Sequence, residues 1–207
     1  MAFFEISDTH SLKSHHYDLR TTIAVEKNAV LFLYLRDDQV LYSATRFYAP
    51  EISDSEKKQL ALNVHDFYKR QLAKLFYYTK KMRQNAIQDA RVDLLARGYL
   101  KYGMAQEAIA LLEPFVKKYS HFSTARATLG KAYFETGDFK TARVHFVQLL
   151  AGKSINAESC FYFGLCEYHL RNCSGAFRAF TRAIAINKRF GAAYFYLGLT
   201  LLLNFVI

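Results

Sequence analysis

A spacing of 34 residues recurs through the second half of the chain and constrains its fold more than any other feature. Small residues hold two positions of this period: Ala96, Gly130, Gly164 and Gly198, and Ala108, Ala142 and Ala176. Large apolar residues hold a third position and glycine a fourth: Leu112, Phe146 and Phe180, and Gly103 and Gly137. A fixed period of this length predicts a solenoid in which each unit buries its apolar face against the next.

The period and its residue types resemble the tetratricopeptide repeat (TPR), whose clearest copy here is Leu129–Tyr133, Gly137–Phe139, Ala142 and Phe146. The resemblance implies a mainly α fold, a right-handed α-solenoid of about three and a half helical hairpins. The repeats fall at 89–122, 123–156, 157–190 and, in part, 191–207. In the third repeat Arg171 stands where the turn glycine is expected, which predicts an irregular turn.

Residues 51–88 are predicted to form a flanking helix that packs on the first repeat. Ser53 or Ser55 is suited to cap its N-terminus, Glu56 lies in its first turn, and apolar residues follow at three- and four-residue spacing.

Residues 1–50 form an N-terminal extension for which the sequence is less informative. Ala29–Leu35 and Gln39–Tyr48 are compatible with a β-hairpin across Asp37-Asp38. A helix is the alternative, because Ser11–Arg36 contains no helix breaker. We favour a small hairpin or an irregular segment.

No motif in the chain indicates catalysis, so we predict that it is not an enzyme and needs no cofactor or metal. His15-His16 cannot place both rings on one helical face, and Cys166, His169 and Cys173 are better explained as core and turn residues. The three cysteines indicate free thiols in a reducing compartment, which predicts an intracellular protein of the nucleus or cytoplasm.

The net charge of +10 lies almost wholly in residues 81–207, which carry seventeen basic and eight acidic residues. This imbalance favours an acidic partner. An acidic and apolar protein segment is the first candidate. Nucleic acid is the alternative, bound by a basic face with these residues: Lys117, Lys118, Arg126, Lys140 and Arg143.

In the TPR family the first helix of each hairpin lines a concave groove. Carried over by register, the predicted peptide-binding residues are Arg97, Leu100, Lys101, Lys131, Phe134, Phe161, Leu165, Tyr168 and His169. The groove would be basic toward its N-terminal end and aromatic toward its C-terminal end. TPRs that bind chaperone C-termini resemble one another in a set of lysines, asparagines and an arginine. That set is not matched by Asp93, Arg97, Thr128, Glu158 and Tyr162, which argues against this ligand.

The uncharged run Gly191–Ile207 is in register as the first helix of a fourth repeat. It is too short for a membrane span. With no capping helix after it, an apolar edge is predicted at Leu199, Leu202, Leu203 and Phe205. The chain is then part of a longer array, or a partner or second copy covers the edge, or the segment touches a membrane.

The run Phe180–Asn204 also resembles the early repeats of the large TPR scaffold in the polymerase-associated-factor (Paf) transcription elongation complex. The residues are Phe180, Arg182-Ala183, Asn187, Ala193, Gly198 and Leu203-Asn204. This resemblance implies a non-enzymatic scaffold for protein–protein interaction within a larger complex, a transcription elongation assembly. A TPR-type secretion chaperone is the alternative, favoured by the chain length and the apolar edge.

Overall fold

The computed structural model describes residues 4–12, 15–84, 91–152 and 155–206, and it divides into two compact units. The first unit contains residues 1–87 with 101–104, and the second contains 88–100 with 105–207. Four strands and a long helix make up the first: β1 (Glu5–Leu12), β2 (His15–Ala24), β3 (Ala29–Arg36), β4 (Gln39–Phe47) and α1 (Asp54–Gln84).

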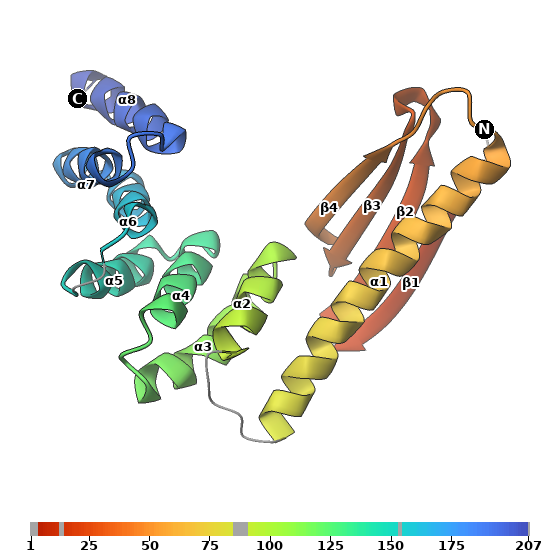
Figure 1. The fold of residues 1–207 in the computed structure, drawn as a ribbon, viewed down its shortest axis with the longest axis horizontal. Coiled ribbons are helices and arrows are strands. Elements are labelled where there is room, and N and C mark those ends of the chain that lie inside the picture. Colours follow the sequence, from red (N-terminus) through yellow and green to blue (C-terminus); the bar gives the residue numbers. More distant parts are fainter. Residues whose placement is uncertain (1–3, 13–14, 85–90, 153–154, 207) are drawn as a thin grey trace. The chain divides into compact units, whose positions relative to one another are not determined.

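The strands form one antiparallel sheet in the order β1-β2-β3-β4 (Figure 1). The hairpin expected across Asp37-Asp38 is formed by β3 and β4, and both turn residues have the positive φ that a tight two-residue turn requires. This hairpin is only half of the sheet, so the prediction of a single hairpin was incomplete. The alternative prediction, a helix over Ser11–Arg36, was wrong. In β2 every second residue, from Tyr17 to Ile23, is buried.

Helix α1 covers one face of this sheet, as Figure 1 shows. Ser53 and Glu56 form a reciprocal cap at its start: Ser53 N donates to Glu56 Oε2 at 2.8 Å, and Glu56 N donates to Ser53 Oγ at 3.3 Å. Phe32 of β3 stacks on Tyr68 with ring centres 4.3 Å apart. The apolar side of α1 therefore packs on the sheet, where we had expected it to pack on the first repeat.

A buried histidine links α1 to two strands through its ring nitrogens. The His65 side chain is 3% exposed; its Nδ1 lies 3.0 Å from Thr21 Oγ1 in β2, and its Nε2 lies 3.0 Å from Asp8 Oδ2 in β1. Lys69 Nζ pairs with the same Asp8 oxygen at 2.6 Å. Both ring nitrogens therefore have partners, as a buried polar side chain requires.

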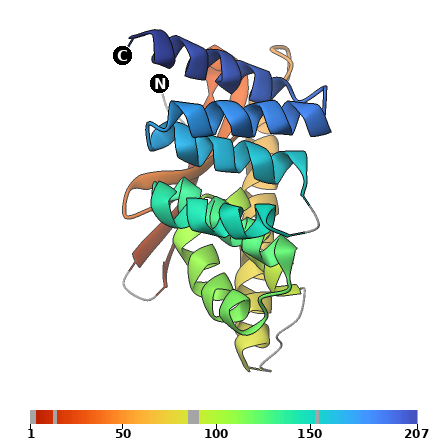
Figure 2. The same cartoon turned by 90° about the vertical axis from the view of Figure 1, so that its left-hand side faces the viewer.

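In its described residues, the second unit consists of helices alone. They are α2 (Arg91–Lys101), α3 (Ala105–Lys118), α4 (Ser123–Glu135), α5 (Phe139–Leu150), α6 (Ala157–His169), α7 (Cys173–Ile186) and α8 (Gly191–Val206). Each helix from α3 onward packs against the next one in the chain. Figure 2 shows α6, α7 and α8 side by side, with α8 as the last of the three.

The small and large positions of the 34-residue period meet inside each hairpin. A Cβ built on Gly130 of α4 would lie 2.9 Å from the Phe146 ring of α5, and one built on Gly164 of α6 would lie 2.6 Å from the Phe180 ring of α7. Real Cβ atoms do not approach this closely. The glycines are therefore required by close helix packing, as the sequence predicted.

The turns at Gly137 and Arg171 have the same backbone conformation. Their φ angles are +82° and +61°. In both turns the next residue donates a backbone hydrogen bond to the carbonyl five residues earlier, from Asp138 to Tyr133 and from Asn172 to Glu167. The irregular turn predicted at Arg171 is thus not present; a non-glycine residue adopts the left-handed conformation instead.

Buried carboxylates tie neighbouring hairpins together. Glu167 of α6 is 1% exposed and accepts hydrogen bonds from Arg143 of α5 and from Asn172. Asp93 of α2 is 2% exposed and accepts hydrogen bonds from Thr128 of α4 and Arg97. Removing one partner of such a group leaves a buried charge uncompensated, so these contacts fix which helix faces meet.

Gly164→Leu is expected to destabilise the array by about 3 kcal/mol, the upper end of the usual cost of overpacking, because the new side chain must occupy the space of the Phe180 ring. Gly198→Leu is the matched control, since a Cβ at Gly198 meets nothing within 4 Å in the described chain. That variant should keep or slightly raise the stability, because leucine favours the helix. Denaturant unfolding of both variants checks this, and equal effects would contradict the repeat register.

Arg171→Gly is expected to stabilise the protein by about 0.5–1 kcal/mol, because glycine adopts positive φ without strain. The reverse change at the equivalent turn, Gly137→Ala, should cost about 1 kcal/mol even though it meets no steric obstacle. Thermal unfolding of the two variants tests the comparison. A loss of stability in Arg171→Gly would show that the arginine side chain matters more than its backbone conformation.

The contacts of Asp8 predict that the free energy of unfolding depends on pH. The hydrogen bond from Lys69, and then the one from His65, lowers the pKa of Asp8 below its ordinary value of 3.8. A lowered carboxyl pKa stabilises the folded state above pH 3.8 and loses that effect as the pH falls through the folded-state pKa. We therefore expect Asp8→Asn to be less stable than the natural chain at neutral pH, by less than about 1 kcal/mol because the carboxylate is partly exposed. Urea unfolding from pH 7 to pH 3 should show the difference shrinking; a constant difference would contradict it.

Candidate functional site

A cleft of about 330 Å³ opens along the first helices of the three hairpins. Its lining comes from α2, α4, α6 and the residues beside them: Arg97, Ser123, Thr124, Ala127, Thr128, Lys131, Leu149, Asn156, Glu158 and Ser159. Arg97 and Lys131, both predicted groove residues, line this one cleft although 34 residues separate them. The repeat brings them together because equivalent helices follow one another along the array.

Lys131 is held between a carboxylate and an aromatic ring. Its Nζ lies 2.6 Å from Glu158 Oε1 and 5.0 Å from the centre of the Tyr162 ring. The Lys131 side chain is 24% exposed, whereas Glu158 is 58% exposed. Attraction to the ring face and to the carboxylate fixes the ammonium group at the cleft wall.

Arg97 is oriented by the buried Asp93. The guanidinium donates to Asp93 Oδ2 through Nε and Nη2, and this bonding raises the pKa of Arg97. Asp93 in turn accepts from the Thr128 hydroxyl. The Arg97 side chain is nevertheless 59% exposed, so it presents a positioned cation to the cleft.

The aromatic part of the predicted groove is also assembled. His169 stacks on Phe139 with ring centres 4.2 Å apart and contacts Phe134 edge-on at 5.5 Å. Burial, and then the charge of Arg171, lowers the pKa of His169 from 6.5, so the ring is neutral at neutral pH. Tyr168 contacts Tyr196 of α8 with ring centres 5.8 Å apart.

Other predicted groove residues lie elsewhere. Phe161 and Leu165 are 8% and 5% exposed and belong to the core shared by α6, α7 and α8, so they contribute packing rather than accessible surface. Leu100 is half-buried, and Lys101 is exposed at the end of α2; neither lines the cleft.

Some lining residues were not predicted as groove residues. Asn156 accepts a hydrogen bond from Ser159 N as the N-cap of α6, and Glu158 follows it. Phe139, which stacks on His169, has Cys173 at the equivalent place in the next repeat. Because these positions vary between repeats, the period gave no signal for them.

The cysteine and histidine residues form no metal site in the described parts of the chain, where no cluster of three suitable side chains occurs. Burial raises the pKa of Cys166 to about 12, which makes it an inert core thiol. His15 pairs with Asp37 at 2.6 Å beside the β3–β4 turn.

The residues of the nucleic-acid alternative are partly engaged within the array. Arg143 bonds to the buried Glu167, and Arg126 bonds to Gln148 and to the Ser120 carbonyl. Lys117, Lys118 and Lys140 are exposed on the surface of α3 and α5. Lys118 Nζ also lies 5.2 Å from the centre of the Tyr119 ring. Because at least three of the five cations have partners in the array, their charge is less available to phosphates.

The predicted apolar edge lies on α8. Leu202 is 64% exposed, and Leu199 and Leu203 are half-buried. The side chain of Phe205 lies outside the described part of the structure. Among the helices described, none is long and apolar enough to cross a membrane.

No protein-family model matches the sequence, and no curated protein matches it. Several solved structures are similar in fold. MamA superposes with a TM-score of 0.60 at 21% identity, over 72% of this chain and 83% of its own. YrrB, a TPR protein with an unusual peptide-binding site, gives 0.53 at 22% identity, over 60% and 64%.

The first TPR domain of human RPAP3 is also similar, with a TM-score of 0.51 at 16% identity, over 54% of this chain and 88% of that domain. These likenesses agree with the 34-residue period and with the glycine contacts inside the hairpins. The helical array of this chain therefore has the tetratricopeptide-repeat fold.

Proposed function

We propose that this chain is a protein-interaction adaptor that binds a peptide with acidic and apolar residues along α2, α4 and α6. The observation that carries the proposal is the cleft in which Arg97 and Lys131 face the same space. Structures of similar fold support it: YrrB has a peptide-binding site, and the first TPR of Spaghetti (RPAP3), at a TM-score of 0.50, is bound to the HSP90 peptide SRMEEVD.

A ligand carboxylate would bind Lys131 by replacing Glu158. Glu158 is the more exposed partner of this pair, and an exposed ion pair contributes little to stability. Replacing Glu158 by a ligand carboxylate therefore costs little free energy. Arg97 differs, because its partner Asp93 is buried and also bonded to Thr128. Arg97 would keep this pair and offer its exposed edge to a second carboxylate.

An apolar side chain of the ligand would pack on the aromatic cluster of Phe134, Phe139 and His169. Neutral His169 presents a flat ring rather than a charge, so an apolar group can cover it without desolvating a cation. The groove therefore favours a segment in which acidic and aromatic or aliphatic residues alternate.

The positions that hold chaperone C-termini in related proteins carry Asp93, Thr128 and Glu158 here, so a chaperone terminus is not the ligand we propose. The run Phe180–Asn204 is the feature that supports a role in a transcription elongation assembly. The non-enzymatic character follows from the absence of a catalytic motif in the sequence.

We expect opposite effects from neutralising the two members of the cleft ion pair. The probe is a synthetic peptide in which glutamate alternates with phenylalanine and leucine. Lys131→Gln should weaken its binding about fivefold, because a cation is lost, while Glu158→Gln should strengthen it by a similar factor, because a competing carboxylate is lost. Isothermal titration calorimetry measures both.

A peptide with glutamine in place of glutamate is the control, and its binding should not respond to either variant. Reversal of Arg97 is avoided because it would leave the buried Asp93 unpaired. Equal binding by both variants would refute the groove assignment. A duplex of nucleic acid that bound more tightly than the peptide, with a steep salt dependence, would favour the alternative function.

A further inference from the structure

The helices α4 and α6, which both border the cleft of Arg97 and Lys131, begin differently. At α6, Asn156 caps the helix and Glu158 adds a carboxylate to the first turn. One repeat earlier, the equivalent residues of α4 are Phe122 and Thr124. Among the described residues, no side chain accepts a hydrogen bond from the first N–H groups of α4. This 13-residue helix therefore presents unsatisfied N–H donors and the positive end of its dipole.

An arginine faces this uncapped N-terminus. Lys131 bonds to Glu158 across the cleft. One repeat earlier, the equivalent residues are Arg97 and Thr124, which line the same cleft. Arg97 therefore lies toward the start of α4, where Thr124 offers a hydroxyl in place of a carboxylate. Its Nε and Nη2 bond to the buried Asp93, while 59% of the side chain stays exposed to a ligand.

A buried hydroxyl lies at the opposite wall of the cleft. Ser159 of α6 is 5% exposed and lines the cleft. Its backbone N–H donates to Asn156, but its Oγ has no hydrogen-bond partner among the described residues. Buried side-chain hydroxyls are normally hydrogen-bonded. An unpartnered hydroxyl in the wall of a cleft therefore points to an acceptor that a ligand brings.

We propose that this part of the cleft binds the phosphate group of a phosphorylated serine or threonine in the partner peptide. This inference rests on the function proposed above, and the phosphate takes the place of the second carboxylate. It accepts hydrogen bonds from the Arg97 guanidinium, the Ser159 hydroxyl and the first N–H groups of α4. Near pH 7 a phosphate carries almost two charges and three acceptor oxygens, whereas a carboxylate carries one charge and two oxygens. Donors on both walls therefore match a phosphate better.

The acidic residues near this subsite already have cations of their own. Glu158 is bonded to Lys131, and the buried Asp93 is bonded to Arg97. The first turn of α4 contains no acidic residue, so the positive potential at the start of this helix is not cancelled from within it. The charge of the phosphate is therefore met at the α4 side of the cleft, with Ser159 across from it.

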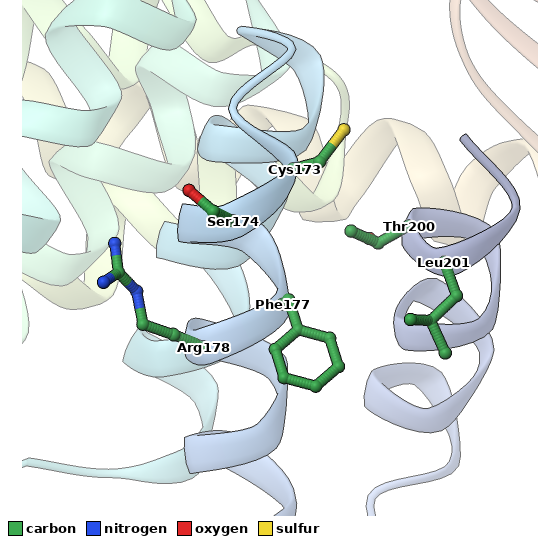
Figure 3. Close-up of a pocket in the computed structure, with 6 residues that line it drawn as sticks. All are labelled: Cys173, Ser174, Phe177, Arg178, Thr200 and Leu201. Atoms are coloured by element: carbon green, nitrogen blue, oxygen red, sulfur yellow. The ribbon is translucent and has the colours of Figure 1, made fainter. Parts of the chain in front are cut away.

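The probes are two versions of the peptide in which glutamate alternates with phenylalanine and leucine, one with phosphoserine and one with glutamate at its central acidic position. By isothermal titration calorimetry, the natural full chain should bind the phosphopeptide at least about tenfold more tightly. Ser159→Ala should remove most of this preference and leave the affinity for the glutamate peptide unchanged. Ser174→Ala is the matched control, because this exposed serine of α7 lines a different cleft, between α7 and α8 (Figure 3).

Thr124→Glu gives α4 the carboxylate that Glu158 supplies to α6. The preference for the phosphopeptide should be lost in this variant, because its own carboxylate occupies the subsite. Its melting temperature should equal or exceed that of the natural chain, because an acidic residue in the first turn is favourable. Thr124→Gln is the neutral control and should keep the preference.

Equal affinities for the two peptides, or a preference that survives both Ser159→Ala and Thr124→Glu, would overturn the proposal. If the glutamate peptide then still binds and Lys131→Gln weakens it, the peptide groove stands and the phosphate subsite alone fails. If neither peptide binds, both fail. In that case, binding of inorganic phosphate that Ser159→Ala abolishes would assign the subsite to a free anion, and equally sensitive binding to vesicles containing a phosphoinositide would assign it to a lipid head group.

Discussion

The close approach of a glycine to a phenylalanine ring is the contact on which the helical array depends. At Gly130 and Gly164 the missing side chain lets the ring of the following helix lie against the backbone. This approach brings the two helices of a hairpin together and so fixes where each first helix points. Because the first helices then follow one another at a constant interval, residues 34 positions apart come to face a common cleft.

Buried polar contacts make the relative orientation of these apolar helices specific. Apolar surfaces tolerate some sliding, whereas a buried carboxylate must meet its donors. Asp93 requires Thr128 of the next hairpin, and Glu167 requires Arg143 of the preceding one. The same contacts place cations at the surface: Arg97 is held by Asp93 with most of its side chain exposed. The electrostatics of the cleft are therefore a consequence of how the hairpins are joined.

The sequence predicted the array well because packing imposes a repeated choice of residue size, which can be read without coordinates. It did not predict the four-stranded sheet. Tyr17 and Leu19 alternate with Asp18 and Arg20 in β2 as in a half-buried strand, but the polar Thr21 at the next buried position weakens this signal. Thr21 is buried because His65, 44 residues away, bonds to it. The Lys131–Glu158 pair was likewise unpredictable, since its two residues are 27 positions apart and the 34-residue period does not relate them.

The contact between α7 and α8 differs from the equivalent contact between α5 and α6. The buried Glu167 of α6 pairs with the half-exposed Arg143 of α5, but the equivalent residues of α8 and α7 are Leu201 and Phe177 (Figure 3). Burying a charge pair requires its desolvation, and the cost in free energy can exceed the gain. Two apolar side chains carry no such cost and gain free energy when water leaves them. The step from α7 to α8 therefore relies on apolar contact where the step from α5 to α6 uses an ion pair.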